Sequence, residues 1–403
     1  MRIIYIHQYY LTPGQGGAIR SYHLTQGMSA EGLKVEVITA HNGRNYDIRW
    51  DGKVKVHLLP VPYDNKFNTF QRLWSFYSFV RQAKSLVNKE NLPDLFYITS
   101  TPLSTGEIGI WARKKWGIPF VFEVRDLWPE APVQVKQIRN RLLKKWLYGR
   151  EYKIYRKASG IVALSPGIQD YVKKLVPEKN VEMVPNFSDT DFFSRKETGA
   201  QKRDFVSQPM TLIYAGAIGE VNGLYQYLEL AAAAKKHRKN WRFQLMGRGN
   251  QLKALKREAK AKSLDRVEFI PFGDKFEVRE RMKKADFAYI SFLPLKVLEL
   301  SSPNKFFDAL AMGLPVVVNF KGWIWDLIEG NGIGFYHDCF NHESLIASLE
   351  ILENSPELVP EMNFKARKLA EKSFDKRLMI SRILKIVEGL GKPSDPTSPG
   401  LVS

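Results

Sequence analysis

The feature that most constrains the fold is an alternation of apolar strands and helical segments, which occurs twice along the chain. The first series starts with a strand at 2–8 and ends with one at 181–186. The second starts at 211–219 and closes with the buried run Val316–Val318. Strand, helix and strand repeated in this way predict doubly wound parallel sheets. The fold class is therefore α/β, with two Rossmann-like domains facing each other across a cleft.

A polar stretch without periodicity separates the two series, and 403 residues favour two domains over one. An amphipathic helix at 373–390 is expected to pack back on the first domain. The expected boundaries are an N-terminal domain over 1–190, a linker over 191–209, a C-terminal domain over 210–372 and a disordered tail over 391–403.

Composition excludes several classes of protein. With 44% hydrophobic and 12% aromatic residues, the chain can bury two cores. Cys339 is the only cysteine, which excludes a disulfide and a cysteine-based metal site. No apolar run is long enough to span a membrane, and the start of the chain is expected to be a strand and not a signal peptide. We therefore expect a cytoplasmic protein.

The net charge of +19 requires an anionic partner, and nucleic acid, acidic lipid and phosphorylated substrates all qualify. The stretch 141–157, which includes Lys144, Lys145 and Trp146, has seven basic residues and one acidic residue. A second helical stretch, at 67–84, carries Trp74 among further aromatic residues. Basic side chains beside aromatic anchors are typical of a membrane interface, although an aromatic stripe is also typical of a core. We expect binding to an anionic membrane surface, on the inner face of the plasma membrane.

The stretch 299–320 predicts a polar loop, a short helix and a buried strand. Ser302 is the expected N-cap, with Pro303 in the first helical position. Such a helix start, with Lys305 one turn in, binds anions and phosphate above all. Asp308 lies on the same face, where it can accept hydrogen bonds from hydroxyl groups. The alternative is a capped surface helix with a solvated lysine.

Gly16 and Gly17 follow the first strand and let backbone approach a ligand closely. The loop lacks the G-x-G-x-x-G spacing of a dinucleotide site, so a plain tight turn is the alternative. Ligands of doubly wound sheets bind outside the carboxyl ends of the strands, where this loop and the pair Arg125-Asp126 fall.

At this point the motifs resemble a known family. The runs YAGAIG at 214–219, MGRG at 246–249, VEFIPFG at 267–273 and SPNKFFDALAMGLPVVV at 302–318 resemble the donor half of a retaining GT-B glycosyltransferase of family 4. EVRDLWPEAP at 123–132 and VPNFSDTDFF at 184–193 lie where that family has its acceptor loop and interdomain linker. The resemblance comes closest to N-acetylfucosamine-type transferases of O-antigen and capsule assembly, whose donors are UDP-linked sugars.

The resemblance implies a donor site. Asp308 would hold the ribose, Lys305 and Arg248 the diphosphate, and the backbone at 270–272 the base. The expected donor-binding residues are Gly16, Gly17, Gly216, Gly219, Arg248, Gly249, Ile270, Pro271, Phe272, Glu299, Ser302, Pro303, Asn304, Lys305 and Asp308.

The chain departs from the family pattern at several positions. Ala217 and Asn222 stand where the family commonly has an arginine and a lysine on the phosphates. Leu300 replaces the first of two paired glutamates, and Glu299 is a substitute one position away. The diphosphate is therefore expected on Lys305, Arg248 and the turn at 216–219.

In the acceptor domain, Arg125-Asp126 replaces the His-Asp pair of the family. Because a guanidinium stays charged, Arg125 would be an electrostatic clamp, while Glu123 and Asp126 are candidate bases or hydrogen-bond acceptors. The alternative is a structural ion pair between Arg125 and Asp126. Arg20 is a second anion-binding candidate, on the acceptor side. The expected catalytic residues are Arg125, Asp126, Glu123 and Lys305.

The implied activity is that of a retaining glycosyltransferase of the hexosyltransferase type. It would move an N-acetylated hexosamine or deoxyhexosamine from a UDP-sugar donor to a polyprenyl-diphosphate-linked saccharide. We expect no metal and no cofactor, because the D-x-D run at 189–191 lies in the linker. Two alternatives stay open: a UDP-sugar-hydrolysing epimerase, and a non-catalytic basic protein that binds nucleic acid. We expect no nucleic-acid partner, because a polyanion binder needs no nucleotide-type cleft.

Overall fold

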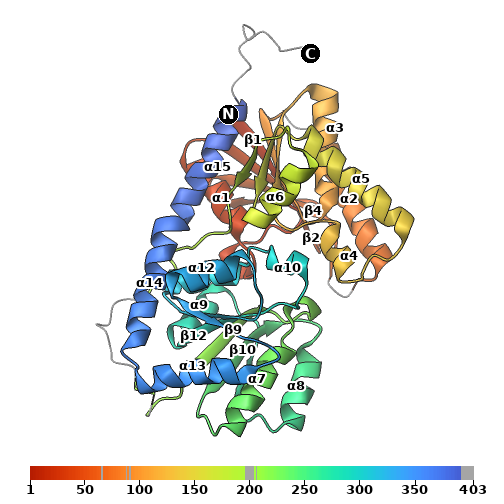
Figure 1. Cartoon of the computed structure of the whole chain (residues 1–403). Coiled ribbons are helices and arrows are strands. Elements are labelled where there is room, and N and C mark those ends of the chain that lie inside the picture. The colour runs from red at the N-terminus through yellow and green to blue at the C-terminus, as the bar shows by residue number, and fades with distance from the viewer. Residues whose placement is uncertain (65–66, 88, 90–91, 196–203, 206, 392–403) are drawn as a thin grey trace.

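The structure is a computed structural model that describes residues 1–64, 67–87, 89, 92–195, 204–205 and 207–391. The chain forms two α/β domains (Figure 1). The segment that joins them, called the hinge below, includes residues 184–189. The tail expected to be disordered lies outside the described residues except for Gly391, and so does part of the expected linker.

The first domain has an eight-stranded sheet in the order β3-β4-β2-β1-β5-β6-β7-β8. All neighbours pair in parallel except β3 and β4, so the expectation of a purely parallel sheet is wrong at this edge. Its strands are β1 (Arg2–Ile6), β2 (Lys34–His41), β3 (Asp47–Asp51), β4 (Val54–Pro60), β5 (Leu95–Thr99), β6 (Phe120–Val124), β7 (Gly160–Ala163) and β8 (Val181–Met183). Its helices are α1 (Arg20–Ala30), α2 (Thr69–Val87), α3 (Gly106–Trp116), α4 (Glu130–Gln134), α5 (Arg141–Lys157) and α6 (Pro166–Leu175).

The second domain has a six-stranded parallel sheet in the order β11-β10-β9-β12-β13-β14. Its strands are β9 (Thr211–Ala217), β10 (Arg242–Arg248), β11 (Val267–Ile270), β12 (Phe287–Ile290), β13 (Val316–Val318) and β14 (Gly334–Tyr336). Its helices are α7 (Tyr225–Lys236), α8 (Leu252–Ala261), α9 (Lys275–Lys283), α10 (Lys296–Glu299), α11 (Asn304–Met312), α12 (Trp323–Asn331), α13 (His342–Asn354) and α14 (Leu358–Ser373). This is the two-domain architecture that the resemblance implies.

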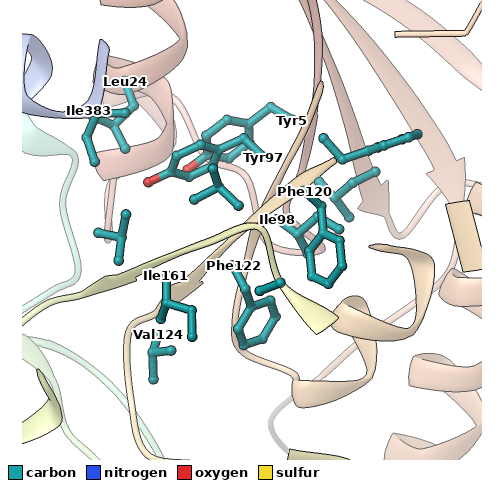
Figure 2. Close-up of a cluster of buried hydrophobic side chains, with 14 of the residues drawn as sticks. Tyr5, Leu24, Tyr97, Ile98, Phe120, Phe122, Val124, Ile161 and Ile383 are labelled. Atoms are coloured by element: carbon teal, nitrogen blue, oxygen red, sulfur yellow. The ribbon is translucent and has the colours of Figure 1, made fainter. Parts of the chain in front are cut away.

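The last helix, α15 (Lys376–Gly391), returns along the first domain (Figure 1). Its residue Ile383 packs beside Leu24 in the core of that domain, where Tyr5 and Tyr97 stack with ring centroids 4.9 Å apart (Figure 2). The chain therefore crosses between the domains twice.

The two crossings are bonded to each other. The backbone N–H of Ser188 donates to the carbonyl of Phe374, and the N–H of Lys376 donates to the carbonyl of Ser188. The Ser188 hydroxyl also donates to the carbonyl of Phe307 in α11. The hinge is thus attached directly to the helix from which the phosphate site is expected.

Candidate functional site

Two glycine turns meet at the carboxyl ends of β9 and β10. A Cβ atom on Gly247 would lie 1.9 Å from the Gly216 carbonyl oxygen, and one on Gly249 would lie 2.1 Å from that of Ile218. The N–H of Ile218 donates to the carbonyl of Arg248 at 2.9 Å. Only glycine at positions 247 and 249 permits this backbone contact, which packs the two turns that carry Gly216 and Gly249 closely together.

Lys305 reaches toward these turns from the first turn of α11. Its amino group donates to the Tyr214 hydroxyl at 2.8 Å and to the Asn222 side-chain oxygen at 3.3 Å. A Cβ on Gly216 would lie 3.4 Å from the same nitrogen. Within the part of the chain that the structure describes, no carboxylate forms an ion pair with Lys305. Burial alone lowers its pKa to about 7, so the amine needs an anion to stay fully charged.

The start of α11 differs from the expectation. The helix begins at Asn304 with Pro303 in the N-cap position, so Ser302 is not the N-cap. The Ser302 hydroxyl instead accepts the backbone N–H of Asn186 at 3.1 Å, because the hinge packs against this loop. The helix still ends as expected at Gly313, which has φ of 67°. The first N–H groups of an α-helix have no partner within the helix, so those of Asn304 and Lys305 can bind an anion.

Asp308 lies one turn further along α11. Lys275, which the sequence did not single out, donates to its carboxylate at 2.5 Å. Burial raises the pKa of Asp308, and the Lys275 charge opposes that shift. With Asn304 and Lys275, Asp308 lines a small cavity at the hinge. The carboxylate is therefore fixed in orientation and borders a space between the domains.

The expected base-binding residues are Ile270, which ends β11, and Pro271 and Phe272 in the loop that follows. The Arg248 guanidinium lies over the Phe272 ring, 4.1 Å from its centroid. From the other domain, Gly16 approaches so closely that a Cβ there would lie 2.9 Å from the same ring. Gly16 thus packs against Phe272 of the other domain, and a side chain at position 16 would force that ring to shift. Gly17 has φ of 79° in the same loop.

Glu299 ends the short helix α10, where its carboxylate pairs with the exposed Lys296 at 2.9 Å. The next residue, Leu300, packs on the first domain: a Cβ on Gly167 would lie 2.5 Å from its side chain. Leu300 therefore serves domain contact at the position where the family pattern has a glutamate.

On the acceptor side, Glu123 and Arg20 lie together inside the first domain. Their side chains form an ion pair at 2.9 Å, and both are almost completely buried. Glu123 also accepts hydrogen bonds from Tyr97 and Thr99, while Arg20 donates to backbone carbonyls of the hinge at 184–185. These hydrogen bonds hold both charged groups inside the protein. Because Glu123 is completely buried and ion-paired, its geometry favours a structural role over contact with an acceptor hydroxyl. Arg20 also lines the small cavity at the hinge.

Arg125 and Asp126 follow β6 without pairing tightly with one another. The Arg125 guanidinium lies 3.4 Å from Nε2 of His7, a residue that the sequence reading missed. Nδ1 of His7 lies 2.9 Å from the Ser21 hydroxyl. Burial and the Arg125 charge lower the pKa of His7, so the ring is neutral and accepts from Arg125. Asp126 is exposed, although surrounding protein raises the pKa of its carboxyl.

Among the described residues, no cluster of histidine, cysteine and carboxylate side chains could hold a metal ion. Asp189, in the D-x-D run, accepts the Lys376 amino group at 2.6 Å and so belongs to the hinge.

The two aromatic and basic helices lie on one side of the first domain, with α3 in contact with both (Figure 1). Helix α2 exposes one stripe of apolar residues, of which Phe70 is 75% and Trp74 61% exposed. Helix α5 exposes Trp146, with Lys145 beside it and Lys144 partly covered. No helix in the described ranges has the length and apolar character to cross a bilayer.

Two protein families match the chain. Residues 15–186 match the glycosyl transferase 4-like domain, and residues 195–369 match the glycosyl transferases group 1 domain. An uncharacterized glycosyltransferase of Haemophilus influenzae is 29% identical over 40% of this chain and 44% of the relative. The amylovoran biosynthesis glycosyltransferase AmsK of Erwinia amylovora is 25% identical over 47% of each chain. The matched region is thus about half the length of these curated relatives.

Solved structures share the whole fold. Sucrose-phosphate synthase of Thermosynechococcus elongatus superposes with a TM-score of 0.78 at 14% identity, over 96% of this chain and 98% of that one. HepE of Anabaena, solved in complex with UDP-glucose, gives a TM-score of 0.70 at 16% identity, over 96% of this chain and 100% of that one. Both are similar to this chain in fold.

Proposed function

Because the chain belongs to the group 1 glycosyltransferases and has the GT-B fold, we propose that it is a retaining enzyme that uses a UDP-sugar donor. Its acceptor would be a polyprenyl-diphosphate-linked saccharide in the synthesis of a surface polysaccharide such as O-antigen or capsule. The sugar would be an N-acetylated hexosamine or deoxyhexosamine, which makes the enzyme a hexosyltransferase. AmsK, a relative, is named for the biosynthesis of the polysaccharide amylovoran.

The observation that carries the donor proposal is the position of Lys305. A buried amine with a pKa of about 7 and no carboxylate partner among the described residues is poorly stabilised in the free protein. A diphosphate between the glycine turns and the start of α11 would supply the missing negative charge. Anabaena HepE, whose fold is similar, was solved with UDP-glucose, which supports a uridine nucleotide as the donor.

In the proposed mechanism the sugar leaves the diphosphate, and charge grows on the phosphate oxygens. Lys305 and the first N–H groups of α11 would stabilise that charge without moving, which is electrostatic preorganisation worth several kcal/mol. Asp308 would accept the ribose hydroxyls, and the loop at 270–272 would meet the base, with Arg248 beside it. No metal ion is needed in this scheme.

The acceptor would approach from the first domain. Arg125, which is partly exposed beside His7, would hold an anionic group of the acceptor, and the exposed Asp126 would accept the hydrogen bond of the attacking hydroxyl. The attack would come from the face that the phosphate leaves, because the product retains its configuration. The buried pair of Arg20 and Glu123 would hold the end of β6, which precedes Arg125, against the hinge at 184–185.

A lipid-linked acceptor requires contact with a membrane. We propose the apolar stripe of α2 and the basic side chains of α5 for this contact, on the inner face of the plasma membrane. An exposed stripe with Phe70 and Trp74, close to a helix rich in lysine and arginine, combines apolar insertion with attraction to anionic lipid.

The test is a thermal-shift comparison of UDP, GDP, CMP and ADP on the wild type and on Asp308→Asn. Stabilisation by UDP above the others, reduced in the variant, supports the donor assignment. Stabilisation by GDP instead would make the donor class wrong. Stabilisation by none of them, together with salt-dependent binding of DNA, would favour a basic nucleic-acid-binding protein.

A further inference from the structure

The loop that leads into α11 belongs to the second domain in sequence but is held by the first. Val297 and Leu298 of this loop are buried in the hydrophobic cluster of the first domain. Ser165 donates its hydroxyl to the carbonyl of Leu300, and Asn186 donates to the Ser302 hydroxyl. The segment made of α10 and the residues that join it to α11, called the donor loop below (residues 296–303), therefore has its conformation set across the domain interface.

Gln134, in α4 of the first domain, supplies another such bond. Its side-chain oxygen accepts the backbone N–H of Val297 at 3.2 Å. Its side-chain nitrogen donates to Glu130 at 2.8 Å. Since the nitrogen faces a carboxylate, the amide has one favourable orientation, with the oxygen toward Val297. Glu130 in turn accepts the hydroxyl of Tyr148, from α5.

We propose that Gln134 is a positioning residue for the donor: it holds the donor loop against the first domain and so fixes the start of α11 in its binding geometry. It does not contact the nucleotide. The inference rests on the proposed function, because the loop is taken to border a nucleoside diphosphate. Its consequence is that donor affinity depends on a side chain of the opposite domain.

The variant Gln134→Met keeps the length of the side chain and removes both hydrogen bonds. Gln134→Asn stays polar but is one methylene too short to bridge Glu130 and Val297. The matched control is Gln137→Met, a few residues further on, where the side chain is exposed and makes no hydrogen bond to the described residues. UDP affinity is measured by calorimetry well below the melting temperature of each protein, so that loss of stability alone does not change it.

Both Gln134 variants are expected to weaken UDP binding by roughly threefold to tenfold, the change in affinity expected from the loss of one hydrogen bond. Gln137→Met is expected to bind UDP as the wild type does. In the free protein, the amide of Val297 should exchange its hydrogen faster in both Gln134 variants. Wild-type affinity in either Gln134 variant would overturn the inference and leave the donor site intact. A wild type that binds no UDP would instead overturn the proposed function, and the inference with it.

Discussion

The amino group of Lys305, on α11, lies 3.3 Å from the side-chain oxygen of Asn222, which follows the first strand of the same domain. Asn222 stands where the resemblance leads one to expect a phosphate-binding lysine. Lys305, from α11, therefore places its positive charge beside the position where the family has that lysine. This relocation explains how a diphosphate could be held although Ala217 and Asn222 carry no charge.

The first prediction concerns pH. The pKa of Lys305 is about 7 in the free protein, and a bound diphosphate would raise it. UDP affinity should therefore be greatest near and below pH 7 and fall by up to about tenfold per pH unit above it. Calorimetry at pH 8 in buffers of different ionisation enthalpy should detect proton uptake on binding. Affinity that stays constant from pH 7 to 9 would contradict the assignment.

A second prediction concerns the glycine turns. Gly247→Ala places a methyl group against the Gly216 carbonyl, so the two turns must separate. UDP binding should be lost or weakened at least tenfold. Gly330→Ala is the matched control, because its Cβ meets open space within a helix of the same domain. Equal UDP affinity in both variants would show that the turns do not border the nucleotide.

Removal of Arg20 should act on stability. Arg20→Met leaves Glu123 buried and unpaired, which is expected to lower the free energy of unfolding by about 3–5 kcal/mol. Arg49→Met, which breaks a partly exposed pair with Asp51, should cost no more than about 1 kcal/mol. Urea titration measures both. Similar values for the two variants would mean that the buried pair has no special structural role.

The membrane surface can be tested with vesicles. The double variant Phe70→Ser, Trp74→Ser should bind vesicles that contain phosphatidylglycerol several-fold more weakly than the wild type. Phe340→Ser removes an apolar side chain that is 95% exposed in the other domain and should have no effect. Co-sedimentation at low salt measures both. An equal loss in the two variants would place the contact elsewhere.

Much of the fold could be predicted from the sequence because its signals are local. Alternating apolar strands and helices predict two doubly wound sheets, and Gly313 with Val316–Val318 predicts where α11 ends and β13 begins. The antiparallel strand β3 was missed, because five residues with polar ends carry no clear strand pattern.

The site was predicted less completely, because it depends on contacts between distant segments. Ser302 has the chemistry of an N-cap, but its hydroxyl accepts the backbone N–H of the hinge residue Asn186, 116 positions away in sequence. Glu123 looked like a free carboxylate because Arg20 precedes it by 103 positions. His7 could have been found: it directly follows the first strand, at the carboxyl end of the sheet where Arg125 was already placed.

The measurement that tests the central claim most directly compares UDP with uridine on the wild type and on Lys305→Met. The account predicts that UDP binds the wild type more tightly than uridine does, and that the variant loses about tenfold to hundredfold in UDP affinity with uridine unchanged. Adding Asn222→Lys to the variant should restore part of the loss. If Lys305→Met binds UDP as the wild type does, the diphosphate is not held by Lys305 and the proposed donor site is wrong.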